Sequence, residues 1–168
     1  MENAQNKAEG LNLLKEKIKD IKVAMLTSVD TDGSLHTRPM HTQPVKDDNL
    51  LWFFTGKNSG KIAEIKEDSH VSLGYADPGS STYVAVCGRA ALVTDKAKID
   101  ELWHDMLKAW FPEGKDDPNI ALLRVTIDSA EYWDSPSSKL VQLVGFGKAL
   151  VTGEPYKPGP GEHGTINM

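Results

Sequence analysis

The chain has 168 residues, 39% of them hydrophobic, and a formal net charge of -5, which suits one domain with a substantial core. The acidic balance argues against a nucleic-acid-binding protein, and no run of about 18 apolar residues predicts a membrane span. The polar start lacks the apolar centre of a signal peptide. The single cysteine, Cys87, cannot form an internal disulfide, and it fits the cytoplasmic location that we expect.

The chain begins with a predicted amphipathic helix, within residues 1–21. Apolar residues recur there at every third or fourth position, which indicates one buried stripe. They are Leu11, Leu14, Ile18 and Ile21. A strand is predicted over 23–29, and the Asp32-Gly33 pair after it predicts a tight turn into the next strand.

Two further extended runs, 35–45 and 50–55, flank a short polar turn, which is the pattern of a β-hairpin. Alternation along the first run places His36, Arg38 and Met40 on one face. His41 falls on the opposite face from His36, so the two histidines cannot share a metal ion, and we predict no metal site. Pro39 and Pro44 remove ladder donors, which suits an edge strand or a bulge.

The second run leads into a polar, glycine-containing loop, 55–61, before a short predicted helix. A helix start offers backbone N–H groups and the positive end of the helix dipole. Ser59 adds a hydroxyl and Lys61 an ammonium, while Arg38 supplies a guanidinium that suits phosphate. The pattern predicts an anion site, although the order of glycines and lysine is not that of a P-loop. A solvated hairpin end with ordinary surface cations is the alternative.

Strands are predicted next over 70–75 and 82–93. Gly88 inside the second strand predicts a bend or a close approach of backbone. Cys87 stands in an apolar run, so we expect it to be a buried small hydrophobe. A helix follows over 95–110, with Thr94 or Asp95 as its N-cap. Its apolar stripe consists of Ile99, Leu102, Trp103, Met106, Leu107 and Trp110.

The last predicted strand runs over 122–127 and leads into Glu131-Tyr132-Trp133-Asp134. Residues 139–151 predict a helix, although the frequent valines allow a strand, and the tail 153–168 predicts a loop. Without a linker or repeat, 1–168 is expected to be a single domain. Six or seven strands with hairpin links favour an antiparallel barrel with packed helices.

Three pieces of the chain together resemble a known family. They are TRPM at 37–40, FFTGKNSGK at 53–61 and EYWD at 131–134. In this order they resemble the pyridoxamine 5′-phosphate oxidase-related, FMN-binding split-barrel superfamily, most of all its general stress protein 26 branch. The resemblance covers about 21–168. It implies a mainly β fold with helices, an antiparallel split β-barrel, and FMN bound between the two subunits of a homodimer.

The resemblance also implies a cofactor site. Arg38, Ser59 and Lys61 would hold the FMN phosphate, and the backbone around Pro39-Met40 and Phe54-Thr55 would line the isoalloxazine ring. Trp133 would lie near the flavin, from the same or the other subunit; a core or dimer-contact tryptophan is the alternative. The full expected set is Arg38, Pro39, Met40, Phe54, Thr55, Ser59, Gly60, Lys61 and Trp133.

Reaction chemistry would reside in the flavin. Pyridoxamine-phosphate oxidases carry arginine- and histidine-bearing segments near the C-terminus, whereas this chain has no arginine after Arg124, which argues against that activity. A general-stress-type FMN-dependent oxidoreductase of unknown substrate is the leading hypothesis. The alternatives are a non-catalytic FMN carrier or sensor, and a split barrel that binds haem or the deazaflavin F420. The cations favour a phosphate-bearing ligand over haem.

Overall fold

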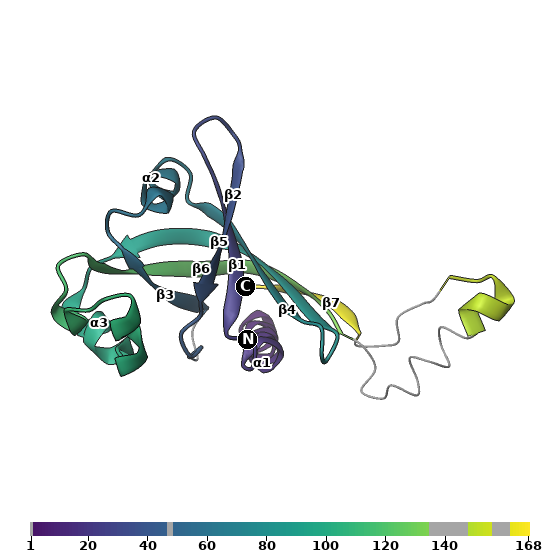
Figure 1. Cartoon of the computed structure of the whole chain (residues 1–168). Helices are drawn as coiled ribbons and strands as arrows, with labels where there is room; N and C mark the ends of the chain where they lie inside the picture. Colours follow the sequence, from purple (N-terminus) through teal and green to yellow (C-terminus); the bar gives the residue numbers. More distant parts are fainter. Residues whose placement is uncertain (1, 47–48, 135–147, 156–161) are drawn as a thin grey trace.

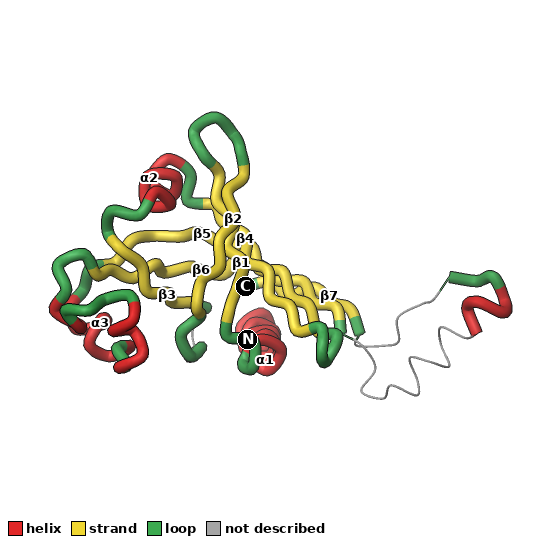
Figure 2. The backbone as a smooth tube through the Cα atoms, viewed as in Figure 1, coloured by secondary structure: helices red, strands yellow, loops and turns green. Residues whose placement is uncertain are grey.

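The computed structural model describes residues 2–46, 49–134, 148–155 and 162–168. Within them, seven strands form one curled antiparallel sheet with the order β2-β1-β4-β5-β6-β3, and β7 pairs with β6 (Figures 1 and 2). The strands are β1 (Val23–Val29), β2 (Leu35–His41), β3 (Leu50–Gly56), β4 (His70–Asp77), β5 (Thr82–Val93), β6 (Ile120–Trp133) and β7 (His163–Asn167). The helices are α1 (Glu2–Ile18), α2 (Gly60–Glu67), α3 (Lys96–Leu102) and the 3-10 turns η1 (Asp105–Ala109) and η2 (Gly114–Asp116).

The two edges of the sheet approach each other beyond β2. Thr42 forms a β-bridge with Phe53 of β3, and the Gln43 N–H donates to the Trp52 carbonyl at 2.9 Å. The long strand β6 pairs with β5 on one side; on the other, its first half pairs with β3 and its end with β7. This curled, nearly closed sheet confirms the predicted antiparallel split barrel with helices.

The main core fills the inside of the curled sheet. Burial alternates along β1 and β4, as a sheet with one face on the core requires. Leu14 and Ile18 of α1 belong to this core together with Ile166 of β7, which confirms the predicted stripe. Each fully buried side chain of this kind contributes roughly 1.5–3 kcal/mol. None of the described helices has the length and apolar character needed to cross a membrane.

The helix predicted over 95–110 is wrong beyond Leu102. The Asp95 side chain does cap its start, accepting from the Ala97 N–H at 3.0 Å, but Trp103 is extended and a 3-10 turn follows. The break lets the chain fold back over the sheet. Leu107 and Phe111 therefore join Leu102 in a second apolar cluster over β6, where a continuous helix would have carried them away.

Two other predictions need correction. The tail expected to be a loop over 153–168 contains β7, because residues 163–167 complete the ladder along the end of β6. Cys87 is exposed rather than buried, because alternation along β5 points Val84 and Val86 into the core and Cys87 outward. The helix or strand predicted over 139–151 lies mostly outside the described residues. The described part near its end, 148–152, is helical.

Gly88 makes the close approach that its place in the strand predicts. The register of β5 against β6 shifts between Cys87 and Gly88, and a Cβ added at Gly88 would stand 2.4 Å from the Thr126 carbonyl oxygen. Only glycine allows the two backbones to lie this close. The bulge lets the long β5–β6 pair bend as the sheet curls.

Candidate functional site

The loop between β3 and α2 is fastened to the chain just before β6. The Lys57 N–H donates to the Asn119 carbonyl at 2.8 Å, and the Asn58 N–H reaches the Asn119 side-chain oxygen at 3.4 Å. Ser59 is the N-cap residue of α2, but its hydroxyl does not cap the helix backbone. That hydroxyl is therefore directed to another partner.

The partner is Lys61, in the first turn of α2. Its ammonium donates to the Ser59 hydroxyl at 2.6 Å and to the Thr55 hydroxyl at 3.0 Å. Burial lowers the pKa of Lys61, and the nearby Arg38 lowers it further, against a smaller opposing effect of Glu64. Two neighbouring cations thus meet at a helix start, where an anion would relieve their repulsion.

Arg38 reaches this place from β2. Its guanidinium donates through Nη2 to Glu64 Oε2 at 2.8 Å and through Nη1 to the Ser28 hydroxyl, which itself donates to Glu64 Oε2. Ser28 lies on β1, beside β2, and Glu64 lies on α2. This closed set of contacts fixes the plane of the guanidinium relative to both elements.

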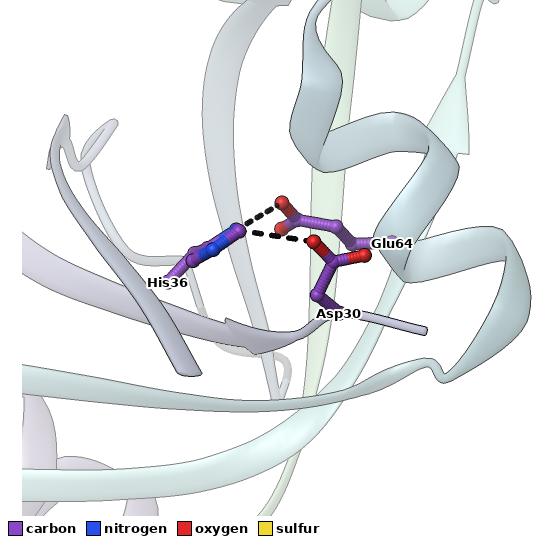
Figure 3. A group of neighbouring side chains, drawn as sticks. All are labelled: Asp30, His36 and Glu64. Carbon is purple, nitrogen blue, oxygen red and sulfur yellow. Dashed lines mark hydrogen bonds and ion pairs between the residues drawn. The ribbon is translucent and has the colours of Figure 1, made fainter. Parts of the chain in front are cut away.

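His36 completes the network from the start of β2. Its Nδ1 lies 2.7 Å from Glu64 Oε1 and 3.7 Å from Asp30 Oδ2 (Figure 3). Burial raises the pKa of Glu64, but hydrogen bonds from Ser28, His36 and Arg38 outweigh it and lower that pKa to about 2. The hydrogen bond with Glu64 in turn raises the pKa of His36.

Asp30, His36 and Glu64 also present potential metal-ligand atoms, all within 4.8 Å of one another. The Arg38 guanidinium, however, lies 2.8 Å from Glu64 and would repel a metal cation. The His36 Nδ1 also shares a hydrogen bond with Glu64 at 2.7 Å, and the Asp30 carboxylate lies at ion-pair distance, 3.7 Å, from the same nitrogen. We therefore assign these side chains to a network of hydrogen bonds and ion pairs.

The structure brings together the residues predicted to hold an anion. Ser59 and Lys61 are in direct contact, and Arg38 is close enough to lower the pKa of Lys61. Gly60 is the first residue of α2, beside them. Thr55, which the resemblance assigned to the ring through its backbone, contributes its hydroxyl to the same cluster.

The other predicted side chains lie elsewhere. Met40 is buried in the main core, and Pro39 is exposed on β2. The Phe54 ring packs edge-on against Trp103, with centroids 6.1 Å apart. Trp133 stacks on His163 at 5.3 Å, at the end of β6 opposite the end that pairs with Gly56. Within one chain, Trp133 is therefore remote from Lys61, and its place beside a flavin stays a prediction.

Sequence reasoning missed Ser28 and Glu64. Both carried a signal: Ser28 alternates with the apolar Ala24 and Leu26 of β1, and Glu64 stands beside Ile65 in the buried part of α2. A polar side chain on a core-facing position needs a hydrogen-bond partner. The two residues satisfy each other, and Arg38 joins them.

Residues 9–157 match the sequence pattern of the family described as pyridoxamine 5′-phosphate oxidase like. The chain belongs to this family. General stress protein 26 of Bacillus subtilis is a relative with 33% identity over 137 residues, covering 77% of this chain and 95% of the relative. Protein bli-3 of Neurospora crassa is 27% identical over 159 residues, covering 84% of this chain and 76% of that protein.

Solved structures of this pyridoxamine 5′-phosphate oxidase-like family share the split-barrel fold. A protein described as a general stress protein 26 from Jannaschia sp. CCS1 superposes with a TM-score of 0.72 at 25% identity, covering 96% of this chain and 99% of that one. The general stress FMN/FAD binding protein of Xanthomonas citri superposes with a TM-score of 0.66 at 34% identity, covering 77% and 92%.

Proposed function

We propose that this chain is an FMN-binding protein of the general-stress type, and that Arg38, Ser59 and Lys61 hold the FMN phosphate with help from Thr55. The observation that carries the proposal is the pair of neighbouring cations, one of them half-buried with two hydroxyl partners, at the start of α2. Glu64 pairs with Arg38, whereas the Lys61 ammonium donates to two neutral hydroxyls, which leaves its positive charge available to an anion.

The donor set suits a phosphate monoester. Lys61 offers a point charge, Arg38 a planar fork, and the two hydroxyls offer neutral donors, which together match a dianion with several acceptor oxygens. The Xanthomonas citri relative, described as an FMN/FAD binding protein, supports a flavin as the molecule that carries this phosphate.

FMN, when bound, would supply the transfer of electrons or hydride, and the residues of this chain would bind and orient it. We propose a flavin-dependent oxidoreductase of unknown substrate as the leading activity. A carrier or sensor without turnover is the alternative. Steady oxidation of NADH or NADPH by the FMN-loaded protein would support the enzyme, and tight FMN binding without turnover would support the carrier.

We further propose that two copies of the chain pair through the outer face of the sheet. Val23 and Met25 of β1 are each 45% exposed, and Tyr83 and Trp133 lie opposite each other on β5 and β6 with similar exposure. These outward apolar side chains sit around the small residues of β4 and β5, a surface that suits a flat contact between two sheets. A partner's Trp133 could then reach a flavin that this chain holds.

A titration of the purified protein with FMN, followed by flavin fluorescence, tests the cofactor site. We expect saturable binding, and a loss of affinity of about tenfold or more for each of Arg38→Ala and Lys61→Ala, because each removes a charged hydrogen bond. Lys57→Ala is the matched control, because the ammonium of this exposed lysine of the same loop donates to the Pro118 carbonyl at 2.8 Å.

Unchanged FMN affinity in the double variant Arg38→Ala/Lys61→Ala would show that the phosphate binds elsewhere. If the unmodified protein bound no FMN, the split barrel would remain and a different ligand, such as haem or F420, would become the leading hypothesis.

A further inference from the structure

We infer that the network of Asp30, His36, Arg38 and Glu64 makes the anion site proton-linked, so that affinity for a phosphate group falls when His36 loses its proton. This inference rests on the proposed phosphate site. It assigns Glu64 and His36 the part of positioning residues, which act on the phosphate through Arg38.

Glu64 connects the two halves of the site. One half, Ser59 and Lys61, begins α2, and Glu64 lies one turn further along the same helix. The other half is Arg38 on β2, which Glu64 holds at 2.8 Å. Only 10% of the Glu64 side chain is exposed, so its carboxylate is poorly screened and acts strongly on the neighbouring charges.

Two anionic groups would therefore compete for Arg38. Its guanidinium already donates hydrogen bonds to Glu64 and Ser28, and a phosphate at Lys61 would compete with Glu64 for the same positive charge. A protonated His36, 2.7 Å from the other Glu64 oxygen, compensates the carboxylate and releases Arg38 toward the phosphate. When His36 becomes neutral, the carboxylate draws Arg38 back and repels the dianion more strongly.

The groups around His36 favour its protonated form. Glu64 faces it from α2, and Asp30 and Asp32 face it from the turn between β1 and β2, while Arg38 on the same strand opposes the proton. The hydrogen bond with Glu64 is the largest of these effects, and the pKa of His36 is raised. Loss of the proton thus falls above the ordinary range of histidine.

The test measures FMN affinity between about pH 6.5 and 8.5, above the second phosphate ionisation. We expect the affinity of the unmodified protein to fall about fivefold on the alkaline side, a size typical of one charge acting across a partly buried site. His36→Asn should make this fall clearly smaller. The difference between the two proteins at each pH reports His36.

Two controls sharpen the result. Riboflavin, which lacks the phosphate, should bind to the unmodified protein and to His36→Asn with the same pH dependence.

The second control is His70→Asn, which removes another histidine paired with a carboxylate, Asp68 at 2.8 Å. This variant should leave the pH profile of FMN affinity unchanged. Glu64→Gln should also make the alkaline fall clearly smaller, because the competition between the phosphate and Glu64 for Arg38 requires the Glu64 charge.

An alkaline fall of the same size in His36→Asn as in the unmodified protein, or FMN affinity in the unmodified protein that does not change over this range, would overturn the inference and leave the phosphate site standing. Absence of FMN binding at every pH would overturn both the inference and the proposed function.

Discussion

At the residue scale, the candidate site depends on one buried carboxylate. Glu64 accepts a hydrogen bond from Ser28 of β1 and is bonded to Arg38 and His36 of β2. A buried charge is tolerated only when it is paired and hydrogen-bonded, and removing its partners is costly. The same contacts that hold Arg38 in the proposed phosphate site therefore also stabilise the fold.

Glu64→Gln should lower the free energy of unfolding at neutral pH by about 3 kcal/mol at most, the size that a pKa lowered from its ordinary value to about 2 implies. Because the folded-state pKa is the lower one, this stability is present above the ordinary carboxyl pKa and is lost as pH falls toward 2. Denaturant unfolding at several pH values should show the difference between the two proteins shrinking in acid.

The exposed Glu67 near the end of the same helix supplies the control. Glu67→Gln removes a carboxylate without removing a buried network and should change stability by less than about 0.5 kcal/mol. A Glu64→Gln protein as stable as the unmodified one at neutral pH would refute the stabilising role of the network.

At the element scale, the pairing of β5 with β6 decides how the sheet bends. The bulge after Cys87 brings the backbone at Gly88 against Thr126. In the curled sheet, β3 pairs with the first half of β6, and the loop before α2 follows β3 there. Packing also explains why α3 ends at Leu102. The chain turns there because Leu107 and Phe111 pack in the second apolar cluster.

Gly88→Ala should destabilise the protein by about 2 kcal/mol or more, because the new methyl group collides with backbone rather than with a flexible side chain. Thermal unfolding should show a melting temperature lower by about 5 °C or more. Gly74→Ala is the matched control on the neighbouring strand, where the added Cβ meets its nearest atom, the Met25 carbonyl oxygen, at 4.0 Å. Equal melting temperatures for the two variants would contradict the packing argument.

At the scale of the whole molecule, the curled sheet has an inner face filled by the core and an outer face that leaves apolar side chains exposed. Val23, Met25, Tyr83 and Trp133 lie on that outer face. The proposed anion site follows β3, which pairs with the first half of β6, and Trp133 lies at the other end of β6, so a flavin that contacts both would need two chains.

Met25→Lys should weaken self-association, because it places a charge in the proposed contact between two sheets. We expect a shift from dimer to monomer in sedimentation velocity at micromolar concentration, with a parallel loss of FMN affinity. Met106→Lys is the control, since this methionine of η1 is 76% exposed and lies outside the proposed contact. A dimer that survives Met25→Lys unchanged would place the interface elsewhere.

Sequence patterns alone determined the first six strands, the amphipathic first helix, the antiparallel barrel and the proximity of Arg38 to Ser59 and Lys61. Alternation and helical spacing are local properties, and they report which side of an element meets the core. The same local rules failed at 95–110 and at β7, where a contact with a distant strand decided the conformation.

Only the tertiary structure decided that Glu64 and Ser28 support Arg38, that His36 adds a titratable charge to them, and that Cys87 faces outward. Ser28 and Glu64 are 36 positions apart in the chain, and no local pattern couples them. They meet because α2 packs beside the end of β1 in the curled sheet. The hydrogen-bond partners of a buried carboxylate are the groups that the tertiary fold places within reach of it. They are therefore set by the assembled barrel and not by the local sequence.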